Sequence, residues 1–209
     1  MSFATSGETD SLMDGALRAC ADFVGCENHR EIVFGQNMTS LTIQLATALS
    51  RTWNPGDEVV VTRLDHDSNV RPWMLAAEWS GATLRRVDID PDGCTHNRSS
   101  LEYSINENTV LVAVGAASNL SGTINDVSAI AEKAHAVGAE VFVDAVHYAP
   151  HCLINVEAMG CDYLACSSYT FFVTHQGVVW GRSKRPAEFP VGTVRGAHPA
   201  HPFRRMTGA

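Results

Sequence analysis

The side chains best suited to chemistry follow short apolar runs in the last third of the chain. The run 140–144 ends at an aspartate and leads to two histidines, and the run 162–166 leads to hydroxyl and phenol groups. A third run, 178–180, lies between two glycines. Open α/β sheets bind ligands just beyond the carboxyl ends of buried parallel strands. The candidate site residues are Asp144, His147, His151, Ser167, Tyr169 and Thr170.

The elements that must position these residues alternate along the chain. Near-continuous apolar strands that alternate with helices predict a three-layer α/β/α domain with a mostly parallel sheet. Ser11 is the expected cap of the first helix, and residues 91–97 are expected to form a loop. Helices are predicted at 11–24, 41–49, 71–80, 99–105 and 124–138, and strands at 31–34, 58–61, 83–87, 109–114, 140–144, 162–166 and 178–180.

Polar segments that follow the predicted strands are expected to meet at one edge of the sheet, because crossover connections between parallel strands are right-handed. In the first of these segments, a glycine turn leads into a helix whose first N–H groups have no internal partner and favour an anion. An ordinary capped helix is the alternative there. The converging segments are 35–40, 65–69, 115–123, 144–151 and 166–170.

Composition limits the class of protein. The chain has 209 residues, 45% of them hydrophobic and 18% charged, as in a globular domain. A net charge of −8 argues against a general nucleic-acid binder. We expect no membrane span and no signal peptide, because no apolar run is long enough and the N-terminus lacks a basic segment before an apolar one. The six scattered cysteines are typical of reduced thiols and predict a cytoplasmic protein.

Three regions are expected along the chain. Residues 1–30 would form an N-terminal helical segment, 31–185 the α/β domain, and 186–209 an irregular tail rich in proline and glycine. From Arg182 onward, six basic residues against one glutamate give a net charge of +5, so the remainder carries −13. We expect no second folded domain in this basic tail.

Six segments in order over residues 30–185 resemble the fold type I enzymes that use pyridoxal phosphate (PLP). The resemblance is to the class V aminotransferase and cysteine desulfurase group, and in particular to its cysteine desulfurase-like members. The matching segments are Gly35-Gln-Asn-Met-Thr-Ser40, Asp65-His-Asp-Ser-Asn-Val-Arg-Pro-Trp73, Ser118-Asn-Leu-Ser-Gly-Thr-Ile-Asn125, Ala134-His-Ala-Val-Gly-Ala139, Val143-Asp-Ala-Val-His-Tyr-Ala-Pro-His151 and Cys161-Asp-Tyr-Leu-Ala-Cys-Ser167.

This resemblance implies a role for each matching residue. Asp144 would lie by the pyridine nitrogen and keep it protonated, which makes the ring an electron sink. His66 and Asp67 stand where the family covers the ring face, and Asp67 aligns with its stacking imidazole. Asn119 and His147 would face the phenolic oxygen. The residues that match phosphate-binding positions are Asn37, Met38, Thr39, Ser167 and Tyr169.

The chain also departs from the family pattern. Thr170 stands at the position of the Schiff-base lysine, and a threonine has no amine to link the cofactor or to move a proton from the substrate. The next lysine along the chain is Lys184, and residues 173–174 read Val-Thr where the family has Gly-Pro. The C-terminal small domain is absent, and none of the cysteines matches the desulfurase cysteine loop.

Three hypotheses follow. The first is a truncated, lysine-less relative that binds PLP or another phosphate-bearing small ligand noncovalently. The second is a Zn²⁺- or Mn²⁺-dependent phosphoester hydrolase, because clustered imidazoles and carboxylates can bind a metal that activates water. The third is an inert or partner-binding pseudoenzyme, with a homodimer as the expected assembly. The candidate metal ligands are Asp65, His66, Asp67, Asp144, His147 and His151.

Overall fold

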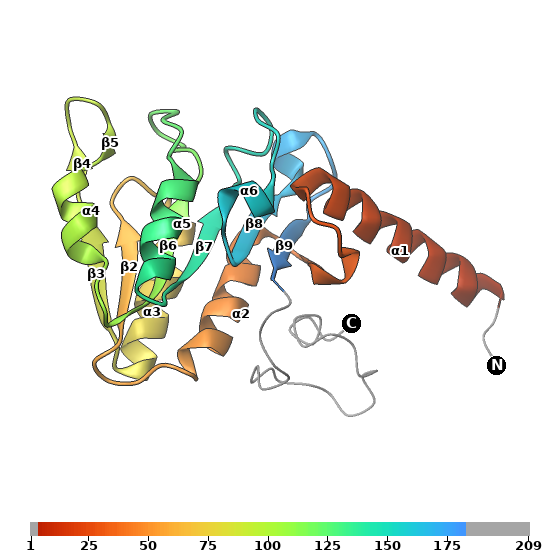
Figure 1. The fold of residues 1–209 in the computed structure, drawn as a ribbon. Helices are drawn as coiled ribbons and strands as arrows, with labels where there is room; N and C mark the ends of the chain where they lie inside the picture. The colour runs from red at the N-terminus through yellow and green to blue at the C-terminus, as the bar shows by residue number, and fades with distance from the viewer. Residues whose placement is uncertain (1–3, 183–209) are drawn as a thin grey trace.

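The computed structural model describes residues 4–182, which form an α/β/α sandwich around a seven-stranded sheet (Figure 1). The strand order is β1-β9-β8-β7-β6-β2-β3, and a second, two-stranded sheet joins β4 to β5. The strands are β1 (Ile32–Gly35), β2 (Glu58–Thr62), β3 (Thr83–Val87), β4 (Ile89–Asp90), β5 (Thr95–His96), β6 (Thr109–Gly115), β7 (Glu140–Asp144), β8 (Tyr163–Ser167) and β9 (Gly177–Gly181). The helices are α1 (Ala4–Val24), α2 (Met38–Ser50), α3 (Arg71–Ser80), α4 (Arg98–Ser104), α5 (Val127–Ala136) and α6 (Val156–Met159).

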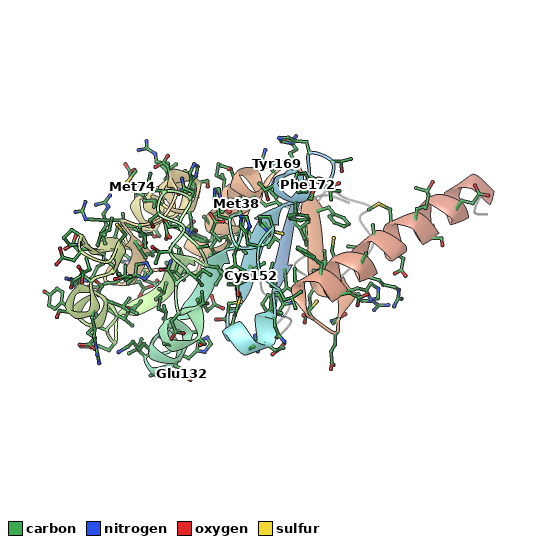
Figure 2. All side chains as sticks on the ribbon, turned by 90° about the horizontal axis from the view of Figure 1, so that it is seen from above. Met38, Met74, Glu132, Cys152, Tyr169 and Phe172 are labelled. Atoms are coloured by element: carbon green, nitrogen blue, oxygen red, sulfur yellow. The ribbon has the colours of Figure 1, made fainter. Side chains whose placement is uncertain are left out.

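The large sheet is parallel except for β9, which is antiparallel to both of its neighbours, β1 and β8. The predicted mostly parallel sheet is therefore confirmed. Its strands are apolar on both faces, so alternate residues enter two separate cores. Along β7, Val141 and Val143 pack in the core under α1, α5 and α6, and Phe142 packs in the core under α2 and α3. Figure 2 shows Met38 and Met74 on one side of the sheet and Glu132 of α5 on the other.

The helix and strand predictions hold for most of the described chain, with some corrections. Ser11 caps nothing, because α1 already begins at Ala4. The predicted loop 91–97 contains β5, which closes a short hairpin with β4. Helix α5 starts at Val127 and not at Ile124, because the Asp126 side chain accepts a hydrogen bond from the Ala129 N–H and caps the helix there. The short helix α6 was not predicted.

The polar segments converge as expected. Strands β1, β2, β6, β7 and β8 all run in the same direction, so the segments that follow them lie at one edge of the sheet (Figure 1). The α1 helix extends away from this body, and its Leu12 is 76% exposed. The predicted tail, residues 186–209, and Lys184 lie outside the described residues.

Two further expectations from the sequence concern the state of the cysteines and the absence of a membrane-spanning helix. All six cysteines lie within the described residues, and each is a free thiol. Among the helices described, none combines the length and the apolar character needed to cross a bilayer.

Candidate functional site

Asp144, the last residue of β7, lies at the centre of the sheet edge where the parallel strands end. Its register neighbours are two small residues, Gly115 of β6 and Ala165 of β8. Asp144 is only 8% exposed, and its Oδ1 accepts a hydrogen bond from the Val146 N–H at 2.9 Å. Burial raises the pKa of Asp144 to about 6, although the Val146 hydrogen bond and the nearby His66 imidazole oppose the rise. Asp144 is therefore a nearly buried carboxylate that favours a cationic neighbour.

A second carboxylate, Asp65, lies on the other side of Gly115. Its Oδ1 accepts from the Gly115 N–H at 2.8 Å, and its Oδ2 accepts from Asn69 Nδ2 at 3.2 Å. A Cβ at Gly115 would lie 2.7 Å from Asp65 Oδ1, so only glycine allows this approach. Asn69 in turn accepts from the Trp73 indole at 3.1 Å. This network anchors the segment after β2, and burial raises the pKa of Asp65 to about 7, with Asp144 contributing.

The remaining predicted residues of that segment point outward. His66 is exposed, and its Nδ1 lies 2.7 Å from Ser68 Oγ and accepts from the Ser68 N–H at 3.1 Å. Asp67 is also exposed and begins the short 3-10 turn η2 (Asp67–Asn69). His66 is nevertheless close enough to Asp144 and His147 to influence their pKa values.

The N-terminus of α2 meets the end of β8. The Met38 N–H donates to Ser167 Oγ at 3.1 Å, and the Asn37 side chain caps the helix by accepting from the Ser40 N–H at 2.8 Å. Thr39 lies between them, is exposed, and has no intrahelical acceptor for its N–H. Gly177 of β9 permits this contact, since a Cβ there would overlap the Asn37 backbone. The predicted anion-binding positions are thus adjacent in space.

The turn that follows β8, η3 (Ser168–Phe171), carries Tyr169 and Thr170. Tyr169 is 42% exposed and stacks on His175, with ring centroids 4.3 Å apart. The Thr170 hydroxyl donates to the Ser167 carbonyl at 2.7 Å and lies 3.3 Å from the Val146 carbonyl. Thr170 therefore lies beside the Asp144–Val146 segment, and its hydroxyl proton is donated to the backbone carbonyl oxygen of Ser167.

Asn119, His147 and His151 line one cavity of about 260 Å³. The cavity lies between the loop after β6 and the turn after β7, and its other lining residues include Tyr148 and Cys152. The cavity brings together Asn119 and His147, which were predicted to act on the same ligand atom. Cys152 was not predicted, because a single cysteine in a turn gives no sequence signal.

The predicted metal site is not assembled. Among the described residues, no three His, Cys, Asp or Glu side chains are placed to bind one metal ion. Asp65 and Asp144 turn inward to the backbone N–H groups of Gly115 and Val146, whereas His66, Asp67, His147 and His151 are exposed at the rim. The described residues therefore do not support the predicted Zn²⁺ or Mn²⁺ site.

Sequence reasoning also missed the residues that hold the site together. Gly115 and Gly177 allow two close backbone approaches, and Asn69 joins Asp65 to Trp73. A glycine at the end of a predicted strand is a weak signal of close approach. The partners of these glycines are distant in sequence and could not be named in advance.

Comparisons with known proteins agree with this geometry. The aminotransferase class-V family model matches residues 2–192. A probable cysteine desulfurase of Halalkalibacterium halodurans is 36% identical over 84% of this chain, and the aminotransferase-like protein FGM3 of Gibberella zeae is 34% identical over 90%. The apo structure of a cysteine desulfurase from Thermococcus onnurineus superimposes with a TM-score of 0.81 at 30% identity, covering 87% of this chain and 45% of that one.

The match extends over nearly all of this chain but only part of its relatives. The chain spans about half the length of these curated relatives, 45% of the first and 46% of the second. The family and the fold agree with the resemblance seen in the sequence. The chain belongs to the class V aminotransferase family, as a partial-length relative of its cysteine desulfurases.

Proposed function

We propose that this chain binds PLP reversibly at the edge of the sheet and does not form the covalent link that lysine provides in the family. The observation that carries the proposal is the position of Thr170, next to the Asp144–Val146 segment, with its hydroxyl bonded to the Ser167 carbonyl. A hydroxyl held in this way offers no amine for covalent attachment. The proposal predicts neither normal transamination nor normal desulfuration.

The residues present fit the chemical groups of PLP. Asp144 is a nearly buried carboxylate between the small residues Gly115 and Ala165, and a protonated ring nitrogen would be a suitable cationic partner for it. Ser167 and the start of α2 are already joined through the Met38 N–H, and the adjacent Thr39 N–H is available for a phosphate oxygen. Asn119 and His147 line one cavity together and would face the phenolic oxygen.

PLP, when bound, supplies an electron sink for a carbanion next to its ring. In this chain Asp144 would hold a proton at the ring nitrogen, and Ser167 with the α2 N-terminus would hold the phosphate. Within residues 4–182, no lysine stands at the position of Thr170 to move a proton at the reacting carbon. The one lysine among residues 4–182 is Lys133 on α5, 3.8 Å from Glu102. The resemblance implies that the family's lysine, which moves the substrate's α-proton, would stand at Thr170.

Absorbance titration tests binding directly. Adding PLP to the full-length chain should produce a saturable change in the visible spectrum that dialysis reverses. Ser167→Ala should weaken the binding, and Ser99→Ala, an exposed serine at the start of α4, serves as the matched control. A spectrum equal to that of free PLP at every protein concentration would show that the cleft does not bind the cofactor.

We also propose that the chain forms a homodimer, because apolar side chains are exposed on its surface. Apolar side chains are exposed on the turns after β7 and β8, where Leu153 is 96% and Phe172 102% exposed. Large exposed apolar patches usually mark interfaces, and a second copy of the chain could cover these side chains. Light scattering on the eluting peak should give twice the chain mass of 22.6 kDa, and a concentration-independent monomer would contradict this assembly. Cytoplasmic location stays a prediction from the free thiols.

A further inference from the structure

Helix α1 has a second apolar face that the core does not use. One face turns inward, where Leu17, Ala21 and Val24 belong to the core that also contains residues of α5 and α6. A second apolar set, about a third of a turn around the helix, is exposed to solvent and recurs at helical spacing. We call this set the outer stripe, which consists of Leu12, Ala16, Ala19 and Phe23.

The outer stripe is open to solvent because α1 extends away from the rest of the domain (Figure 2). Leu12 is 76% exposed, whereas Phe23 is 38% exposed and stacks on Phe171, with the ring centroids 4.8 Å apart. The next two residues continue the apolar surface, since Phe172 is 102% and Val173 56% exposed. An exposed apolar surface of this kind usually marks an interface, so we expect the outer stripe to contact a partner.

The order of residue sizes along the outer stripe makes it complementary to itself. Its two large residues are at the ends and its two alanines are in the middle. When two such helices lie antiparallel and Ala16 of one faces the partner's Ala19, Leu12 faces the partner's Phe23, because each large residue lies four positions outside its alanine. The same contacts then occur twice about a two-fold axis, as a symmetric dimer requires. The facing alanines allow the two helices to approach closely.

The charged residues of α1 do not oppose this pairing. Asp14 and Arg18 pair with each other at 2.7 Å on the side of the helix away from the outer stripe. Asp22 lies beside the stripe, and in the antiparallel pair it would come close to the uncharged Ser11 of the partner's helix. The outer stripe itself carries no charge, so an uncharged apolar surface suits it better than the basic tail 186–209 does. A second copy of the stripe is such a surface.

We propose that α1 of one chain packs antiparallel on α1 of a second copy through the outer stripe. This inference rests on the homodimer proposed above and names the surface that forms it. The N-terminal part of the partner's α1 would then lie near Phe172 and Val173. One helix pair about 30 Å long is small beside the roughly 800 Å² per partner of a standard interface, so the dimer should dissociate on dilution.

Sedimentation velocity of the full-length chain over a wide range of concentrations tests this pairing. Ala16→Glu and Ala19→Lys, each measured alone, should raise the dissociation constant of the dimer about a hundredfold or more, because each dimer would bury two unpaired charges. An equal mixture of the two variants should dimerise again, because positions 16 and 19 face each other only in the antiparallel register. Ala136→Glu, at an exposed alanine that ends α5, is the matched control and should leave the dissociation constant unchanged.

The outcomes separate this interface from the homodimer itself. A dimer that tolerates Ala16→Glu would overturn the pairing through α1 and leave the homodimer in place. A monomer of the unaltered chain at every concentration would overturn both, and would assign the outer stripe to another segment or another protein. Variants that dissociate alone and do not associate when mixed would overturn the antiparallel register. Association of the mixture also shows that both variants keep a folded α1, and PLP binding is measured independently of all these results.

Discussion

Replacing Asp144 by asparagine should stabilise the protein while weakening its cofactor site. The pKa of Asp144 rises from 3.8 to about 6 in the folded state, so folding disfavours its ionised form. The folded state then binds more protons than the unfolded state, and stability falls as pH rises from about 4 to about 7. Asparagine has no charge to desolvate, and its Oδ1 can still accept from the Val146 N–H.

The size of the expected gain in stability follows from the pKa shift of Asp144. At 1.36 kcal/mol per pKa unit, the ionised carboxylate costs about 3 kcal/mol at pH 8 and about half of that at pH 5. Asp144→Asn should therefore raise the free energy of unfolding by about 3 kcal/mol at pH 8, or Tm by about 6–12 °C for a chain of this size. The gain at pH 5 should be about half as large.

Urea unfolding of both proteins at pH 5 and pH 8 measures these differences. Asp67→Asn, an exposed carboxyl at the same edge of the sheet, is the matched control and should change stability by less than about 0.5 kcal/mol. The reasoning is refuted if Asp144→Asn gains nothing at pH 8, or gains equally at both pH values. The same variant should bind PLP more weakly, because asparagine cannot pair with a protonated ring nitrogen.

Other positions lead to further expected outcomes. Ser167→Ala leaves the Met38 N–H without its acceptor and should lower the free energy of unfolding by about 1–3 kcal/mol, measured by urea titration. An unchanged urea midpoint would show that this hydrogen bond does not stabilise the fold. Gly177→Ala places a methyl group against the Asn37 backbone and should cost about 1–3 kcal/mol, whereas Gly15→Ala on α1, with open space around it, should be neutral or stabilising. Phe172 has a φ of 68° and is fully exposed, so Phe172→Gly should stabilise an isolated monomer by about 1 kcal/mol; a concentration-dependent loss of stability would instead place Phe172 in an interface. PLP affinity should increase as pH rises through about 6, where Asp144 ionises, and an absorbance titration that shows the opposite trend would contradict its role.

Much of the fold could be predicted because strand composition and turn residues are local signals. The apolar run 140–144 is an uninterrupted strand, and its terminal aspartate lies at the edge that topology requires. Direction is not local: nothing in the composition of 177–181 distinguishes the antiparallel β9 from its parallel neighbours. The β4–β5 hairpin was missed because each of its strands has only two residues, too few for a period-two pattern.

The sequence predicted which segments come together at this edge of the sheet, but it did not predict which way their side chains point. Ser167 and Met38 meet as expected, since one ends β8 and the other begins α2 at the same edge of the sheet. The described residues do not support the predicted metal site, and a list of acidic and imidazole residues could not say which of their side chains face inward. The inward direction of Asp65 depends on the Gly115 N–H, 50 residues away in the chain.

Borohydride treatment of the PLP-loaded chain, followed by intact mass measurement, tests the central claim most directly. The account predicts that the wild-type chain gains no cofactor mass, because residue 170 is a threonine and the bound PLP is held without a covalent link. Thr170→Lys, which supplies an amine at that position, should gain the mass of one reduced cofactor. Stoichiometric labelling of the wild-type chain at Lys133 or Lys184 would contradict the account and show that another lysine reaches the site.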